Sequence, residues 1–221
     1  DVRVTASDAS RIESDVEAAA LSVSATMFSG LSVAVGVSVA RNEVRNDMQA
    51  CVSGVGALTA VNGSVLVGAD QSANIAAASS ASAITVGLSS RDNKAFSGGG
   101  ATAVNVIAGT SNAFIQDSTV TAAGTGAGQG QVALSAVNSS GIDATVKAIS
   151  VSGGAGTGTT PAVAIGFSLA RNLIGWNEYG GKNPIDVRAY VTDTGAAEAT
   201  GIHAARGLTV TAAAGGRVHA V

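Results

Sequence analysis

Much of the chain alternates, with a period of two residues, between small or polar side chains and larger apolar ones. Residues 21–24 read Leu-Ser-Val-Ser, and residues 33–39 read Val-Ala-Val-Gly-Val-Ser-Val. This alternation places one set of side chains on each face of a β-strand. The pattern predicts a succession of short strand, long strand, turn, long strand and short strand. The turns are expected at 27–30, 90–93 and 157–160, and the fold is therefore expected to be all-β.

The same pattern returns at long intervals. Stretches that share an alanine at their fifth position and a branched aliphatic residue at their eleventh begin at Val2, Val65, Val132 and Leu208. We interpret 1–221 as a single repeat array. Its units are expected at 2–64, 65–131 and 132–207, with the start of a fourth at 208–221. Since the array begins and ends inside this pattern, we expect the chain to be a piece of a longer protein.

The second long strand of each unit repeats one face, which reads glycine, a small residue, alanine, asparagine and a branched aliphatic residue. We expect this face and the small face of the first long strand to meet in a thin interior, because glycine, alanine and serine permit a close approach. The asparagines of this face are predicted to form a structural ladder, since buried amides need partners. They are Asn42, Asn105 and Asn172. The alternative is that each asparagine simply turns the chain.

Two all-β architectures fit this organisation. The first is a β-solenoid built from repeats of about 63–76 residues, in which matching strands of successive units pair in parallel. The second is an antiparallel meander of long β-hairpins. The sequence leaves open whether one repeat forms one solenoid rung or two rungs of about thirty residues. The stretch 16–40 contains a single charge, Glu17, but its alternation favours two strands over a membrane-spanning helix.

Composition limits the classes of partner and environment. Charged residues make up 12% of the chain, aromatic residues 3%, and the net charge is −3. The basic residues are scattered, so no nucleic-acid partner is expected. The single cysteine, Cys51, excludes an internal disulfide and is compatible with an exported bacterial repeat protein.

Few residues offer chemistry. The two histidines, His203 and His219, lack a second ligand at metal-binding spacing, and Cys51 aligns with Phe114 and Tyr190 at an ordinary apolar position. The glycine-rich stretch "GTGAGQG" lacks the lysine of a phosphate-binding loop. We therefore expect no catalytic, cofactor or metal site. The alternative is a carbohydrate-active parallel β-helix enzyme, which would need paired acids on one outer face.

One insertion differs in composition from the rest. The stretch "WNEYGGKNPID" at 176–186 holds the only tryptophan and is a candidate interaction loop. Aromatic side chains are enriched at binding hot spots, and insertions in solenoids often lie on a binding face. The residues expected to act there are Trp176, Tyr179 and Lys182. The alternative is a self-packed loop in which Trp176 covers the side of the solenoid.

If the small faces meet inside, the larger apolar faces must point outward. Exposed apolar patches of more than a few hundred Å² are rare on soluble monomers, so we expect lateral self-association. Gly98, Gly100 and Thr102 interrupt the outward apolar residues of the second unit, and the interface is expected to be patchy.

The phrases "VSVARNEV", "ATAVNVI", "SLARNLI" and "AFIQDSTVTA" resemble the repeat regions of giant bacterial surface proteins, the filamentous-haemagglutinin-like adhesins. The resemblance implies a non-catalytic stalk or fibre element of an extracellular or cell-surface protein. It also implies partners of three kinds: neighbouring repeats of the same parent chain, further copies, and a host surface or polysaccharide. The aspartate of calcium-binding glycine-rich repeats is missing, so no calcium stack is implied.

Overall fold

The computed structural model describes residues 1–192 and 201–221, and every regular element in these ranges is a β-strand. No described residue belongs to a helix long and apolar enough to cross a membrane. The predicted turns at the ends of the long strands are confirmed, because β2 (Arg11–Thr26) ends just before the first turn and β3 (Gly30–Ser53) begins just after it. Ser10 to Glu13 match the spacing of a helix-capping box, but Glu13 lies within β2 and no helix begins there.

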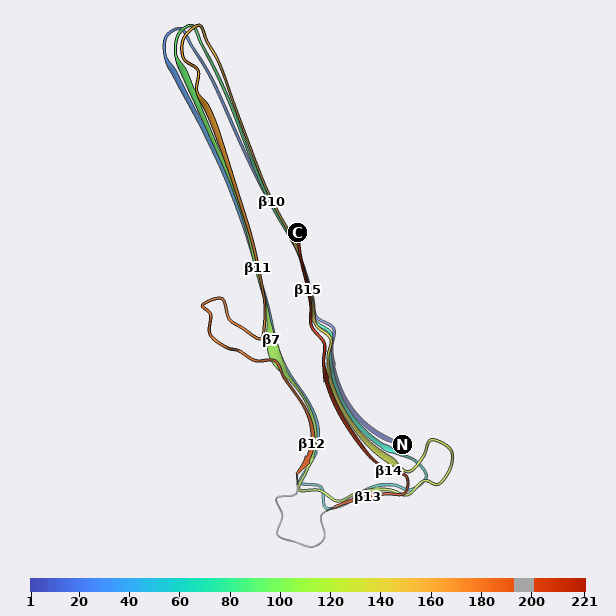
Figure 1. Cartoon of the computed structure of the whole chain (residues 1–221). Coiled ribbons are helices and arrows are strands. Elements are labelled where there is room, and N and C mark those ends of the chain that lie inside the picture. The colour runs from blue at the N-terminus through green and yellow to red at the C-terminus, as the bar shows by residue number, and fades with distance from the viewer. Residues whose placement is uncertain (193–200) are drawn as a thin grey trace.

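The strands form four sheets, each made of corresponding strands from successive passes of the chain (Figure 1). One sheet contains β1 (Val2–Asp8), β5 (Val65–Gln71), β9 (Gln131–Asn138) and β14 (Gly207–Ala214). The next contains β2, β6 (Asn74–Ser89), β10 (Gly141–Ala155) and β15 (Arg217–Ala220). The third contains β3, β7 (Asn93–Gln116), β11 (Ala162–Ile174) and β12 (Asp186–Thr192). The short strands β4 (Leu58–Ala60), β8 (Val120–Ala122) and β13 (Ile202–Ala204) form the last.

All pairings within these sheets are parallel. Val2 lies opposite Val65, Val65 opposite Val132, and Leu208 opposite Val132, so the paired residues are 63, 67 and 76 positions apart. The antiparallel meander would require antiparallel pairs between neighbouring strands, which these sheets do not contain. If each rung held about thirty residues, paired residues would lie about thirty positions apart in the chain. The observed pairs lie 63, 67 and 76 positions apart. The fold is all-β with parallel sheets, an arrangement compatible with a β-solenoid.

The long strands form an arm whose interior consists of small residues. A Cβ added at Gly36 would lie 2.5 Å from the carbonyl oxygen of Ser82, and one added at Gly99 would lie 2.9 Å from that of Ile149. Such distances are too short for a side chain, so the two layers approach at these positions only because the residues are glycines. Hydroxyl groups bridge the layers elsewhere in the arm, for example Ser38 Oγ with Ser79 Oγ at 3.0 Å. The interior of the arm is therefore thin because the side chains that face each other across it are small.

Larger residues fill the core where the layers separate toward the base (Figure 1). One buried cluster lies between the short and long strands at the base and includes Val67, Ile115, Val120 and Leu134. A second cluster includes Val44, Ile75, Ile107 and Ile142. We call this level, between the base and the arm, the waist. Both clusters are built from branched aliphatic residues that recur along the stack, so each pass of the chain extends the same core.

The larger faces of the arm point outward and stay uncovered within the described residues. On β3, Val35 and Val37 are each 63% exposed, and on β11 Phe167 is 59% exposed. On the opposite side of the arm Leu21 is 72% exposed. The short strands lie at the base and do not fold over these faces (Figure 1).

Candidate functional site

The structure brings Asn42, Asn105 and Asn172 into one column across three strands. Asn42 lies opposite Asn105 in β7, and Asn172 lies opposite Asn105 on the other side. Asn42 Nδ2 donates to Asn105 Oδ1 over 2.8 Å, and Asn105 Nδ2 donates to Asn172 Oδ1 over 2.8 Å. Asn105 is fully buried. Each amide therefore uses the neighbouring amide as its partner along the stack, which removes most of the cost of burying these polar groups.

A second polar column, which is not among the residues predicted from the sequence, crosses the waist. Gln71 lies between Asp8 and Asn138 in the β1–β5–β9 sheet. Asn138 Nδ2 donates to Gln71 Oε1 over 2.9 Å, and Ser111 Oγ donates to the same oxygen over 3.2 Å. The seventh position of three units is polar in the sequence, and that recurrence is the signal that could have indicated this column.

Asp8 ends this column at the first strand. Its carboxylate accepts hydrogen bonds from Ser10 Oγ, from Asn46 Nδ2 at 2.7 Å and from the Ser10 amide at 3.1 Å. Partial burial of the carboxylate acts to raise its pKa, but these three hydrogen bonds favour the charged form. Together they outweigh burial and hold the pKa of Asp8 below its ordinary value of 3.8.

The insertion after β11 lies on the outer side of the β3–β7–β11 sheet (Figure 1). Trp176 and Lys182 form an isolated antiparallel bridge, and Asn177 Oδ1 accepts hydrogen bonds from the amides of Tyr179 and Gly181. Glu178 forms an ion pair with Arg41 of β3, which lies 137 residues earlier in the chain, with 2.8 Å between Oε1 and the guanidinium nitrogen. The loop is thus closed on itself and tied to the side of the stack.

The candidate interaction residues of this loop differ in their exposure. Tyr179 is 89% exposed, Trp176 is 44% exposed, and Lys182 is also exposed. A hydrogen bond from the phenol to Glu178, together with the negative charge of that carboxylate, raises the pKa of Tyr179. A small pocket lies between the loop and the sheet. Its lining includes Val106 of β7, which is buried. Part of the loop therefore packs on the sheet while the tyrosine remains available to solvent.

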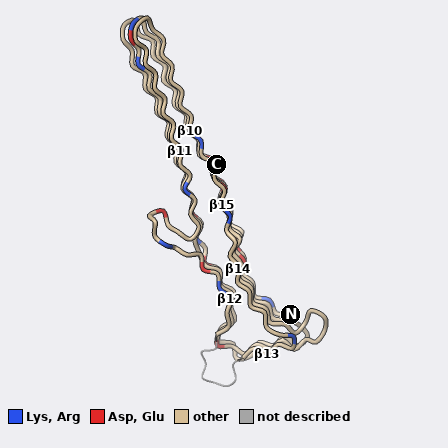
Figure 2. Tube along the Cα trace, viewed as in Figure 1, with Lys and Arg blue, Asp and Glu red and all other residues tan. Residues whose placement is uncertain are grey.

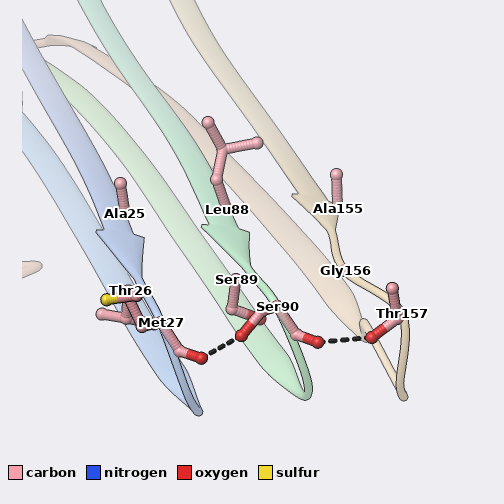
Figure 3. Close-up of a pocket in the computed structure, with 9 residues that line it drawn as sticks. All are labelled: Ala25, Thr26, Met27, Leu88, Ser89, Ser90, Ala155, Gly156 and Thr157. Carbon is pink, nitrogen blue, oxygen red and sulfur yellow. Dashed lines mark hydrogen bonds between the residues drawn. The ribbon is translucent and has the colours of Figure 1, made fainter.

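The turns at the tip of the arm stack as the strands do. Ser90 Oγ donates to the carbonyl oxygen of Met27, and Thr157 Oγ1 donates to that of Ser90 (Figure 3). These turns line a shallow, open depression together with Ala25, Leu88 and Ala155. Its polar groups are already paired with one another along the stack, so they form a structural ladder rather than a free set of ligand donors.

Charged residues are almost absent from the middle of the arm and gather at the tip, waist and base (Figure 2). At the waist a shallow outer depression is lined by Glu13, Asp15 and Asp143, with an alanine-rich row of β6 between β2 and β10. Glu13 pairs with Arg11 at 3.4 Å, and Asp143 pairs with His219 Nδ1 at 3.0 Å. The described residues include no group of three or more histidine, cysteine or acidic side chains placed to hold a metal ion.

The remaining candidates occupy ordinary positions. Cys51 lies opposite Phe114, which stacks on Tyr190 with 5.1 Å between ring centroids. This row is on the outer surface, and Cys51 is exposed. His203 lies in the short strand β13. No histidine lies within the described contacts of Cys51, so the arrangement contains no thiol–imidazole pair.

No protein-family model matches the chain. No curated protein and no solved structure matches it significantly either.

Proposed function

We propose that this chain is a non-catalytic structural segment, a stalk or fibre element, of a large extracellular bacterial protein of the adhesin or matrix-forming kind. In this proposal the stacked strands form a β-solenoid in which each repeat of 63–76 residues supplies one rung. The observation that carries the proposal is the unbroken register between β3 and β7, in which 24 consecutive residues of one strand lie opposite 24 of the next. Polar groups inside the arm pair both along the stack, as Asn42 does with Asn105, and between the layers, as Ser38 does with Ser79.

The dimensions define the kind of fibre. A strand of 24 residues extends for about 80 Å, whereas each added strand thickens a sheet by only about 4.8 Å. This chain is therefore a thin blade, and its stacking axis is its short dimension. A stalk of this design would be a ribbon, which becomes longer than it is wide only after roughly seventeen rungs. Neighbouring repeats of a parent chain are the natural partners of the two open ends.

A ligand on a host surface or a polysaccharide fits the insertion loop best. Tyr179, Trp176 and Lys182 are exposed in this loop, and aromatic side chains stack readily on apolar faces of sugars and of proteins. The loop stands on the side of the blade, so it would remain accessible when further rungs are added at the ends.

Small-angle scattering of chains that contain two, three and six concatenated repeats tests the architecture. The longest dimension should stay near 80 Å while the thickness grows by about 4.8 Å for each rung. Repeats that behave as separate bodies on a string would contradict the solenoid. Labelling of intact cells of the producing organism with an antibody against this chain tests the surface location, and labelling only after permeabilisation would contradict it.

The rival function is carbohydrate hydrolysis, and the waist depression with Glu13, Asp15 and Asp143 is the observation that favours it. Glu13 and Asp143 lie two strands apart in register, about 10 Å, and glycosidases of the inverting class place their acids about 6.5–9.5 Å apart. Glu13, however, is paired with Arg11, and Asp143 is in contact with a ring nitrogen of His219. Release of reducing ends from a panel of polysaccharides, abolished by Glu13→Gln and Asp143→Asn, would establish this function instead.

A further inference from the structure

The outer face of the β3–β7–β11 sheet lacks side chains along part of its middle strand. In register, Gly98 lies between Val35 and Ile165, and Gly100 lies between Val37 and Phe167. The flanking residues are all more than half exposed. We call Gly98 and Gly100 the glycine row. It is a strand-wide gap between two rows of branched or aromatic side chains.

The chain's own fold does not require glycine at these positions. A Cβ added at Gly98 would meet only Val35 Cγ2 at 3.9 Å, and one added at Gly100 would meet only Val37 Cγ2 at 4.0 Å. Neither residue has the positive φ that excludes a side chain. The intervening Gly99 is different, because its Cβ would lie 2.9 Å from the carbonyl oxygen of Ile149. Glycine weakens a strand interior, and an otherwise unexplained one often marks the close approach of another backbone or ligand.

We propose that a second copy of this chain packs on the glycine row through the opposite face of its own arm. On that opposite face Leu88, which is 47% exposed, is the most exposed of the large side chains of the middle strand. Leu88 is flanked in register by Ala25 and Ala155. The outer face of the β3–β7–β11 sheet thus has a groove along β7. The outer face of the β2–β6–β10 sheet has a protruding side chain, Leu88, near the tip of the arm. The two faces are complementary in shape.

The insertion loop decides between like and unlike faces. It lies on the same outer side as the glycine row, where Glu178 pairs with Arg41, and it covers Val106 just below the row. Two copies that met through this same face, with their arms parallel, would bring both loops into the space between the sheets. The opposite face of the arm carries no insertion. With parallel arms, a contact between unlike faces places only one loop between the sheets, and such a contact repeats in one direction rather than closing into a dimer.

The area predicts the strength of the contact. Three strands about 4.8 Å apart and an apolar arm length of about 30 Å give each face roughly 430 Å². A stable protein interface needs about 800 Å² on each partner. Three rungs therefore support a weak, concentration-dependent contact, and the area grows in proportion to the number of rungs.

Sedimentation velocity over a wide concentration range tests the proposal on this chain. The wild-type weight-average mass should rise with concentration. The double variant Gly98→Val/Gly100→Val should associate at least about ten-fold more weakly, because it fills the space that the second copy occupies. Its unfolding midpoint should equal or exceed that of the wild type, because β-branched residues favour strands. Gly68→Val is the matched control, since Gly68 is also an outward glycine with open space in a middle strand, but lies in the base sheet.

Three results would overturn the proposal. The first is a wild-type chain that stays monomeric at all concentrations. The second is association that the double variant leaves unchanged, as pairing through the open ends of the sheets would give. The third is binding of zwitterionic lipid vesicles by a chain that remains monomeric, which would assign the face to a lipid surface. The inference rests on the proposed structural role, but a monomeric chain whose thickness still grows with each rung would leave that role standing.

Discussion

The side chains of Asn42 and Asn105 are joined by a hydrogen bond of 2.8 Å although 63 residues separate them in the chain. Asn105 continues the contact to Asn172 over the same distance. The middle amide therefore donates to one neighbour and accepts from the other. Removing it leaves a donor of Asn42 and an acceptor of Asn172 without their partners, which is why the middle position should be the most sensitive one.

We expect Asn105→Leu to lower the free energy of unfolding by roughly 1–3 kcal/mol. The substitution removes two hydrogen bonds and introduces a bulkier side chain into a thin interior. Asn62→Leu is the control, because Asn62 is exposed in a turn. Urea denaturation of both variants measures the difference. Equal midpoints would contradict a stabilising asparagine column.

Gly98→Ala and Gly99→Ala should have opposite effects although the two residues are adjacent. The added methyl group of Gly99→Ala would meet Ser150 Oγ at 2.8 Å and the Ile149 carbonyl oxygen at 2.9 Å, so the layers must separate. We expect a loss of about 1–3 kcal/mol from this overpacking. Gly98→Ala points outward into open space and should be neutral or stabilising by up to about 1 kcal/mol. Thermal unfolding at low protein concentration separates the two, and a similar loss for both would contradict the assignment of inner and outer faces.

Asp8 should make the stability depend on acid pH. Its pKa is lower in the folded chain than its ordinary value of 3.8, so the folded state binds a proton less readily than the unfolded state. The stabilisation that Asp8 supplies is complete above its unfolded pKa and disappears as the pH falls through the lower folded value. The difference in unfolding free energy between wild type and Asp8→Asn should therefore shrink below about pH 4. Asp70→Asn, an exposed acid one position before Gln71, is the control. A difference that stays constant from pH 7 to pH 2 would show that Asp8 does not titrate in this way.

The insertion loop should be dispensable for folding. β7 runs past the corresponding position without an insertion, from Ile107 through Gly109. Replacing residues 176–184 by a two-residue link should retain the β-sheet circular dichroism spectrum and lower the unfolding free energy by at most about 1–2 kcal/mol, because the Arg41–Glu178 ion pair and the cover over Val106 are lost. The single variant Tyr179→Ala should leave stability unchanged. Failure of the shortened chain to fold would show that the loop is part of the core.

The strands, their turns and the two faces of each strand follow from the sequence alone. These features are local, because a period of two assigns neighbouring side chains to opposite sides whatever the strand pairs with. The recurrence of the Asn42 face in later repeats indicated that the asparagines belong together, since equivalent positions of a stacked repeat lie side by side. The outward position of Val35 and Val37 followed from the same alternation.

The direction and register of pairing could be read only from the folded chain, because both an antiparallel meander and a parallel stack satisfy the same alternation. The register places Gln71 between Asp8 and Asn138, a column made of three different residue types that sequence identity does not indicate. The structure also separates two neighbouring glycines, Gly98 and Gly99, by what a side chain would meet, which depends on a layer about fifty residues away in the chain. The ion pair between Glu178 and Arg41 is likewise visible only in the folded chain, since strands far apart in sequence become neighbours only when the repeats stack.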